Sequence, residues 1–274
     1  MNNYIKLVNF EVRRFLKIFI FLVSAVVITQ IIGAIISSNA FLDEVKMSMR
    51  QQNLTESEYI HQYSGYSLHN FLNTGFFQIS VVFAATVLVI YVFFIWYRDW
   101  LGKSSFIYRL LMLPTERRNV YLAKLTAILL FVLCLVGVQV VLLEVAEQII
   151  QWIVPEHLRV NYDVIAIYSY EILTLLYPQT LLQFVLIYGL GITIVAVVFT
   201  GILFERSYHL KGVILAAFYI AVSVAVIIAP IIIQSNINYF YEQEIILLTI
   251  VCYILAFAAA IFTANHLLKQ KINV

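Results

Sequence analysis

Residues 76–96 read FFQISVVFAATVLVIYVFFIW, an apolar run that contains no charged side chain. A helix needs about 20 predominantly apolar residues to cross the hydrocarbon core of a bilayer, so this stretch predicts a membrane-spanning helix. Other stretches of similar length and polarity lie on both sides of it along the chain. The six expected spans are residues 15–36, 76–96, 125–149, 180–204, 212–233 and 245–267.

The composition of the whole chain agrees with this interpretation. Of the 274 residues, 63% are hydrophobic and 12% are charged, and the mean hydropathy of +0.93 is far above that of a soluble domain. The alternating ten-residue segments of a membrane barrel are missing. The sequence therefore predicts an all-α, polytopic membrane protein in which residues 1–274 form a single transmembrane domain. Cys134 and Cys252 fall inside apolar stretches, which favours packing over redox or metal chemistry.

The basic residues between the spans predict the orientation of the chain. Lys and Arg concentrate in the cytoplasmic connections of membrane proteins. With the N-terminus inside, 14 of the 17 basic residues are cytoplasmic, whereas the opposite orientation would reverse that ratio. We therefore expect both termini on the cytoplasmic side of the cell (inner or plasma) membrane. The 14 are Lys6, Arg13, Arg14, Lys17, Arg98, Lys103, Arg109, Arg117, Arg118, Lys124, Arg206, Lys211, Lys269 and Lys271.

Two helices at the membrane surface are expected in addition to the spans. Before the first span, apolar residues such as Leu7 and Val12 alternate with basic ones such as Lys6 and Arg13, which predicts an amphipathic interfacial helix. The alternative is a basic anchor without a helix of its own. The external segments are residues 38–75 and 150–178, and the second has a helical apolar pattern that Pro178 would end. That pattern comprises Val164, Ile167, Tyr168, Ile172 and Leu175.

Polar residues near the outer end of the third span share one helical face. Their spacing of three, four and seven residues places them in a single stripe. Intramembrane carboxylates are costly and therefore candidates for function, so the stripe could line an exit vestibule. A long helix that projects into water explains it equally well. The residues are Glu144, Glu147, Gln148 and Gln151.

Alanines recur at every fourth position on the last two spans. Small residues at this spacing let helices approach each other closely. In lipid the burial of apolar surface does not favour helix association, so close packing matters more, and the alanines predict helix–helix contacts. Pro230 is expected to kink the fifth span. The alanines are Ala217, Ala221, Ala225 and Ala229 on the fifth span and Ala256, Ala260 and Ala264 on the sixth.

The sequence lacks the patterns of a nucleotide-binding or catalytic chain. Gly102, Lys103 and Ser104 resemble the end of a phosphate-binding loop, but the earlier glycine would fall at Tyr97. No HExxH motif, central histidine cluster or paired intramembrane carboxylates occur, so we expect no catalytic or metal site. No cofactor is expected in this chain, and nothing points to nucleic acid.

The longest cytoplasmic connection, residues 97–124, contains a charged elbow. Apolar residues from Phe106 to Leu113 precede the sequence Pro-Thr-Glu-Arg-Arg, and Thr115 could cap the helix that leads into the third span. The pattern predicts a short helix, a turn and a second helix, which suits docking to a soluble partner. The candidate docking residues are Leu110, Leu113, Pro114, Thr115, Glu116, Arg117 and Arg118.

This connection resembles that of the ABC-2 type permeases, the transmembrane subunits of ABC exporters. In that family a Leu-Leu-x-Leu-Pro-x-x-Arg-Arg-like stretch, often followed by a lysine, joins spans two and three. The resemblance covers about 20 residues as a motif and most of the chain in outline, with six spans and internal termini. The short connection between spans five and six departs from many relatives. The matching residues are Leu110, Leu111, Leu113, Pro114, Arg117, Arg118 and Lys124, with Asp99 and Gly102 at a looser acidic and glycine position.

The resemblance implies a half-transporter. The elbow would be the coupling segment that seats in an ABC ATPase subunit, which binds ATP and Mg, and a second permease subunit would complete a homodimer or heterodimer in membrane lipid. The abundance of Phe and Tyr favours a hydrophobic or amphipathic cargo such as a membrane-active peptide. One alternative is a stand-alone immunity or sensor protein that binds a peptide through residues 38–75. A membrane-embedded enzyme is a further alternative, although convergent catalytic groups are lacking.

Overall fold

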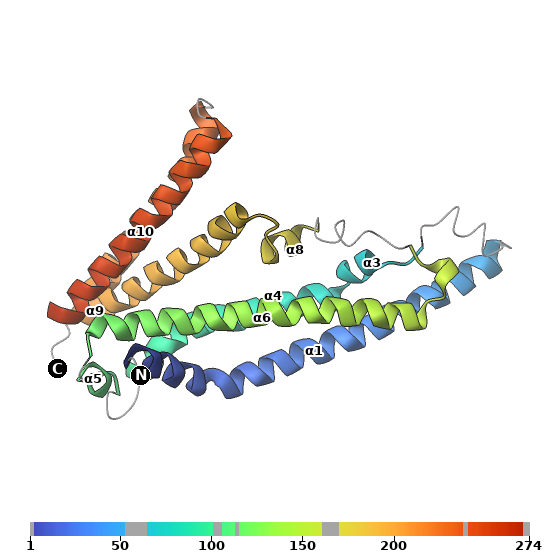
Figure 1. Ribbon diagram of the computed structural model, residues 1–274, viewed down its shortest axis with the longest axis horizontal. Coiled ribbons are helices and arrows are strands. Elements are labelled where there is room, and N and C mark those ends of the chain that lie inside the picture. The colour runs from blue at the N-terminus through green and yellow to red at the C-terminus, as the bar shows by residue number, and fades with distance from the viewer. Residues whose placement is uncertain are drawn as a thin grey trace. The chain divides into compact units, whose positions relative to one another are not determined.

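The computed structural model describes residues 3–52, 65–100, 106–112, 115–160, 170–237 and 241–270. Within these ranges the regular structure is helical, apart from an isolated β-bridge between Tyr66 and Arg159. The all-α prediction is therefore confirmed for the described chain (Figure 1). In chain order the elements are α1 (Asn3–Gln52), α3 (Leu68–Leu72), α4 (Gly75–Trp100), α5 (Phe106–Leu111), α6 (Arg117–Ile153), the 3-10 helix η1 (Glu156–Leu158), α8 (Glu171–Leu176), α9 (Leu181–Ile237) and α10 (Glu242–Gln270).

Six stretches of the described helices are long and apolar enough to cross a membrane. Each overlaps one of the predicted spans. Many of their large apolar side chains point outward, such as Phe21 and Ile79, which are 72% and 69% exposed. A soluble protein rarely exposes so much apolar surface, so the chain has the architecture of a multi-pass membrane protein. The stretches are Asn3–Gln51, Gly75–Trp100, Arg117–Ile153, Leu181–Tyr208, Leu210–Ser235 and Gln243–Gln270.

The first helix is longer than predicted at both ends. α1 begins at Asn3 without a break before the first span, so the separate interfacial helix that we expected is part of the span helix. It also continues to Gln52, well into the predicted external segment. No glycine or proline follows Gly33 in this stretch to stop the helix, and Val45 near its end is buried.

The expected break between the fourth and fifth spans is also helical. α9 keeps helical backbone from Leu181 to Ile237, and Pro230 lies inside it. The helix nevertheless doubles back on itself. The evidence is that the backbone at Gly212 approaches that of Phe204 so closely that a Cβ atom on Gly212 would collide with the Phe204 carbonyl oxygen. Only glycine fits such a close approach of two backbone segments. The connection between these two spans is therefore a tight bend rather than a loop.

The chain divides into two compact units. Unit 1 comprises residues 1–15, 88–130 and 178–274, and unit 2 comprises residues 16–87 and 131–177. Several long helices contribute to both units.

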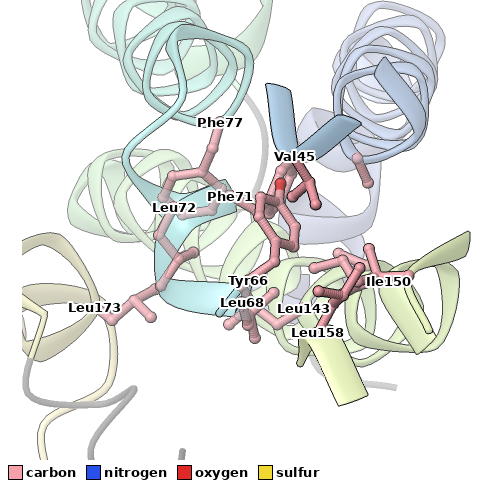
Figure 2. Packing of buried hydrophobic residues seen from close by; sticks show 13 residues of the cluster. Val45, Tyr66, Leu68, Phe71, Leu72, Phe77, Leu143, Ile150, Leu158 and Leu173 are labelled. Atoms are coloured by element: carbon pink, nitrogen blue, oxygen red, sulfur yellow. The ribbon is translucent and has the colours of Figure 1, made fainter. Parts of the chain in front are cut away.

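Unit 2 contains an apolar cluster built largely from the predicted external segments. Figure 2 shows side chains from the end of α1, from α3 and from the end of α6 packed together. The backbone of Tyr66 pairs with the end of η1 and the residues after it. The Tyr66 N–H donates to the carbonyl of Leu158 at 2.9 Å, and the Tyr66 carbonyl accepts from the N–H of Val160 at 3.0 Å. Burial raises the pKa of the Tyr66 hydroxyl above its usual range. The described parts of the two external segments thus pack against each other.

A neutral polar contact joins α1, α4 and α6 inside unit 2. The amide nitrogen of Gln30 donates to Ser80 at 2.8 Å and to Gln139 at 2.9 Å, and the Gln139 amide donates back to Gln30 at 3.0 Å. All three side chains are buried. Nearby, a Cβ atom on Gly33 would collide with Phe76, so α1 and α4 approach each other closely there.

Unit 1 packs α6, α9 and α10 through aromatic and small residues. The Tyr121 hydroxyl donates to the carbonyl of Ala196 at 2.8 Å, and Thr200 donates to the carbonyl of Ala260 at 3.1 Å. Tyr121 also contacts Phe199 edge-on, with ring centroids 5.7 Å apart. Of the alanines predicted to pack, those on α10 are buried: Ala256, Ala260 and Ala264.

Candidate functional site

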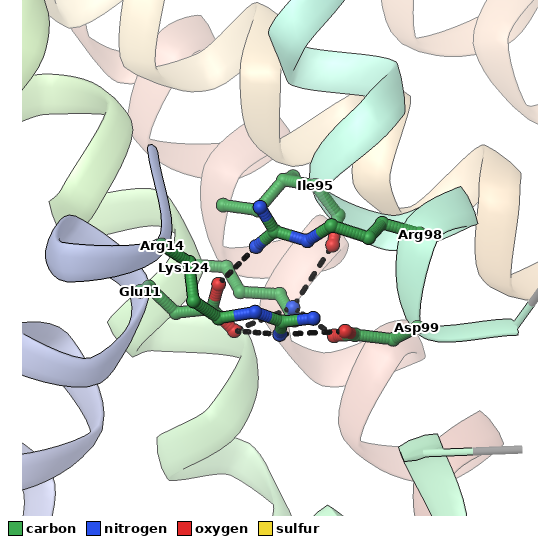
Figure 3. A network of polar contacts seen from close by, with 6 residues as sticks. All are labelled: Glu11, Arg14, Ile95, Arg98, Asp99 and Lys124. Atoms are coloured by element: carbon green, nitrogen blue, oxygen red, sulfur yellow. Dashed lines mark hydrogen bonds and ion pairs between the residues drawn. The ribbon is translucent and has the colours of Figure 1, made fainter. Parts of the chain in front are cut away.

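A cluster of buried charges ties together α1, α4 and α6 in unit 1. The ammonium of Lys124 lies 2.7 Å from the Glu11 carboxylate and 2.5 Å from the Asp99 carboxylate. Figure 3 shows these groups with two arginines around them. Arg14 donates to Asp99 at 2.7 Å, and Arg98 donates to Glu11 at 3.0 Å. We call these five residues the ionic cluster.

The ionic cluster is closed to solvent at its centre. Lys124 and Asp99 are fully buried and Glu11 is 2% exposed. Taking an ion out of water costs several kcal/mol, roughly, unless opposite charges and hydrogen bonds replace the water. Asp99 meets the ammonium and the Arg14 guanidinium, whereas Glu11 meets the ammonium, the Arg98 guanidinium and, at 3.9 Å, that of Arg14. The ammonium also donates to the carbonyl of Ile95 at 3.0 Å. The ammonium further lies 5.2 Å from the centre of the Trp96 ring. The two carboxylates and the ammonium at its centre are therefore compensated within the cluster, although the Nε of Arg98 is buried without a hydrogen-bond partner among the described residues.

Arg14 connects the ionic cluster to the short helix α5. Its guanidinium carbon lies 5.0 Å from the centre of the Phe10 ring and 5.1 Å from that of Phe106. These two rings stack with centroids 5.8 Å apart. One face of Arg14 thus contacts the first residue of α5, while its nitrogen contacts Asp99. A displacement of α5 would act directly on a residue of the cluster.

The charged elbow follows α5 and is partly exposed. α6 begins at Arg117, which places Glu116 rather than Thr115 at its N-cap position, and the Asn119 N–H donates to the Glu116 carbonyl at 2.8 Å. Glu116 and Arg118 are exposed and form an ion pair. Of the other predicted docking residues, Leu110 is buried in α5 and Thr115 is half-buried, while Leu113 and Pro114 lie outside the described residues.

Two further polar contacts hold the neighbouring helices. The guanidinium of Arg117 donates to the carbonyl of Leu268 near the end of α10. The Tyr97 hydroxyl donates to Glu205 on α9, and Arg206 lies over the Tyr97 ring with its guanidinium carbon 4.8 Å from the centroid. The start of α6 is thereby linked to α10, and the end of α4 to α9.

The predicted exit residues form an exposed face of α6. Glu144, Gln148 and Gln151 are exposed and Glu147 is half-buried. The Gln148 amide donates to the Glu144 carboxylate at 3.4 Å. Both interpretations of the stripe require such a face, so the exit vestibule stays a prediction.

The predicted alanine face of the fifth span is turned outward. Ala217, Ala221 and Ala225 are exposed and Ala229 is half-buried. The buried positions of this half of α9 lie on another face of the helix, at Ala216, Ser223 and Ile227, with Ala216 facing Gly201. Successive residues are about 100° apart around a helix. Repeating alanines alone could not distinguish these two registers.

Sequence reasoning missed the centre of the ionic cluster. Lys124 and Asp99 were noted only as parts of a motif, and Glu11 was not singled out. A carboxylate among the basic residues before the first span was the available signal. Its partners are 87 and 113 residues away along the chain, so no local pattern reveals them.

Within the described residues, no group of three or more His, Cys, Asp or Glu side chains could hold a metal ion. Comparison with protein-family models, with curated proteins and with solved structures finds no match to this chain.

Proposed function

We propose that this chain is the transmembrane permease subunit of an ATP-driven ABC exporter of the ABC-2 type. The observation that carries the proposal is the contact of Arg14 with both α5 and the ionic cluster. It provides a mechanical path from the elbow to the ends of α1, α4 and α6. Residues 110–124 resemble the coupling segment of ABC-2 permeases, so this path would connect an ATPase to the membrane-spanning helices.

The path works in two steps. An ATPase that pushes on the elbow moves α5, and Arg14 passes the displacement to Asp99 and Lys124, which lie on different helices. Arg117 carries the same movement to the end of α10 through the Leu268 carbonyl. Charge pairs in a buried site have few alternative arrangements, so the helix ends move together rather than independently.

The orientation of the chain fits this assignment. The distribution of basic residues predicts that the ionic cluster, the elbow and both termini lie on the cytoplasmic side of the cell membrane. Glu116 and Arg118 are exposed there and suit contact with a soluble ATPase, which would bind ATP and Mg itself. The start of α1 would lie near the membrane surface as its amphipathic segment.

The rest of the transport path would involve a second permease subunit. The outward alanine face of α9, centred on Ala221, would allow close contact with another bundle, identical or a sister chain. The many exposed aromatic and aliphatic side chains favour a hydrophobic or amphipathic cargo, such as a membrane-active peptide. Glu144 and its neighbours on α6 would lie at the exit.

Retention of an ATPase by the purified chain tests the proposal. The tagged chain is isolated in mild detergent from its native cells, and Mg-dependent ATP hydrolysis is measured in the eluate. We expect hydrolysis with the unaltered chain and a loss of roughly tenfold or more with Arg117→Ala combined with Arg118→Ala.

The control is Lys46→Ala combined with Arg50→Ala, which removes two exposed basic residues at the other end of α1. It should keep the full ATPase signal. The proposal is wrong if the unaltered chain carries no ATPase, or if the elbow variant retains it while remaining monodisperse.

A further inference from the structure

A groove opens between the first turns of α1 and the helix α5. It encloses about 460 Å³, a volume within the range of pockets that bind small molecules. Its walls come from residues 3–10 of α1, from α5 and from Thr115, all in unit 1. The groove is separate from the centre of the ionic cluster, none of whose five residues lines it.

The floor of the groove is apolar. Leu7 and Leu110 are 7% and 5% exposed and lie on its two sides. The stacked rings of Phe10 and Phe106 complete the floor. Such a surface gains from contact with hydrocarbon rather than with water.

The rim of the groove is cationic. Lys6 on α1 and Arg109 on α5 are both exposed and line it from opposite helices. Asn3 and Thr115 add neutral polar groups, and none of the described lining residues is a carboxylate. A ligand must therefore offer negative charge at the rim and an apolar portion at the floor.

We propose that this groove binds the headgroup end of an anionic phospholipid from the leaflet on this side of the membrane. The anionic phosphate lies between Lys6 and Arg109, and the first part of an acyl chain rests on Phe10 and Phe106. A small inorganic anion would leave the apolar floor uncovered, and a neutral apolar ligand would gain nothing from the positive charge at the rim. The proposal does not depend on an ATPase partner.

The position of the groove along α1 favours a lipid over a protein as its occupant. Ile5 lies between the lining residues Asn3 and Lys6 of α1 and is 54% exposed, next to the exposed Lys6. Exposed apolar and basic side chains side by side on a helix are typical of a segment at the membrane surface. Basic side chains next to an anionic leaflet each add about 1 kcal/mol of attraction.

Lipid retention measured by native mass spectrometry tests the assignment. The full chain is purified in detergent, incubated with phosphatidylglycerol or with phosphatidylcholine of the same acyl chains, and transferred to the gas phase. We expect one phosphatidylglycerol per chain to be retained and phosphatidylcholine to be lost. Lys6→Gln combined with Arg109→Gln should lower the retained phosphatidylglycerol roughly tenfold or more, since two cations are removed.

Two additional variants make the test specific. Thr115→Trp fills the groove without changing its charge and should also lower retention. Lys46→Gln combined with Arg50→Gln removes the same number of cations elsewhere on α1 and should leave retention unchanged.

Three results would overturn the proposal. The first is equal retention of the two lipids, and the second is unchanged phosphatidylglycerol retention in the charge variant and in Thr115→Trp. The third is unchanged lipid retention together with loss of a bound ATPase in Lys6→Gln, Arg109→Gln, which would assign the groove to a protein partner. Since lipid binding is read on the isolated chain, its failure leaves the proposed exporter function standing.

Discussion

The helices α1, α4 and α6 meet at two polar contacts of opposite chemistry. In unit 1 the contact is the ionic cluster, with Lys124 between the carboxylates of Glu11 and Asp99. In unit 2 it is the neutral contact of Gln30, Ser80 and Gln139. Both are buried, but only the first depends on a balance of charge.

We infer from this difference that the ionic cluster can respond to a partner, whereas the neutral contact mainly stabilises the packing of the three helices. Removing one member of a buried charge set leaves the others with an uncompensated charge, whereas removing a neutral amide leaves only an unmade hydrogen bond. The ionic cluster also adjoins α5 through Arg14. We therefore expect the charged contact to be both costlier to break and closer to function.

The largest effect is expected from Lys124→Met. This change removes the ammonium from both buried carboxylates and leaves the guanidiniums of Arg14 and Arg98 as their described cationic partners. Breaking a buried pair typically costs about 3–5 kcal/mol. The free energy of unfolding is measured by denaturation in mixed detergent micelles. Lys46→Met, at an exposed site, is the control, and a loss below about 1 kcal/mol for Lys124→Met would contradict the role given to the cluster.

Gly33→Leu should have the next largest effect, in the neutral region. A side chain at this position collides with Phe76 and forces α1 away from α4, at a cost of about 1–3 kcal/mol for overpacking. Gly137→Leu is the matched control, because a Cβ atom there meets nothing within 4 Å. Equal unfolding free energies of the two variants would show that α1 and α4 do not approach as described.

A smaller loss is expected for Gln139→Leu. The change removes its hydrogen bonds with Gln30, and such bonds between membrane helices contribute about 0.6–2 kcal/mol. Gln148→Leu on the exposed face of the same helix should have little effect in the same assay. If Gln139→Leu destabilises as much as Lys124→Met, the contrast between the two contacts fails.

Arg118→Ala should change stability least. Its ion pair with Glu116 is exposed, and exposed pairs contribute about 0–1 kcal/mol. Under the proposed function, the same variant should nevertheless weaken ATPase retention. Retained ATPase with unchanged stability would remove Arg118 from the docking surface.

The fold was predictable where hydropathy decides it. Apolar length is a local property, so residues 76–96 alone identify a span. The extent of α1 to Gln52 was not predictable in this way, because Val45 is buried by residues of α3 and α6 that are distant in sequence. Hydropathy located the connection between the fourth and fifth spans, but not that it is a tight bend, which depends on the close approach of Gly212 to Phe204.

The candidate site was predictable only at its exposed edge. The elbow follows from local charge and a turn signal, so Glu116 and Arg118 were found. The ionic cluster pairs residues from three distant stretches of the chain. The spacing of residues within one stretch therefore does not predict which of them pair. A carboxylate and a lysine that each lie near the basic end of a span indicate such pairing only in retrospect.

Site-specific photo-crosslinking tests the central claim most directly. A photoreactive amino acid is placed at position 116 of the elbow or, for comparison, at position 144 on the exposed face of α6, and cells are illuminated. The account predicts a cross-link from position 116 to a protein that hydrolyses ATP, and none from position 144. Absence of that cross-link at position 116, or an equal yield at position 144, would contradict it.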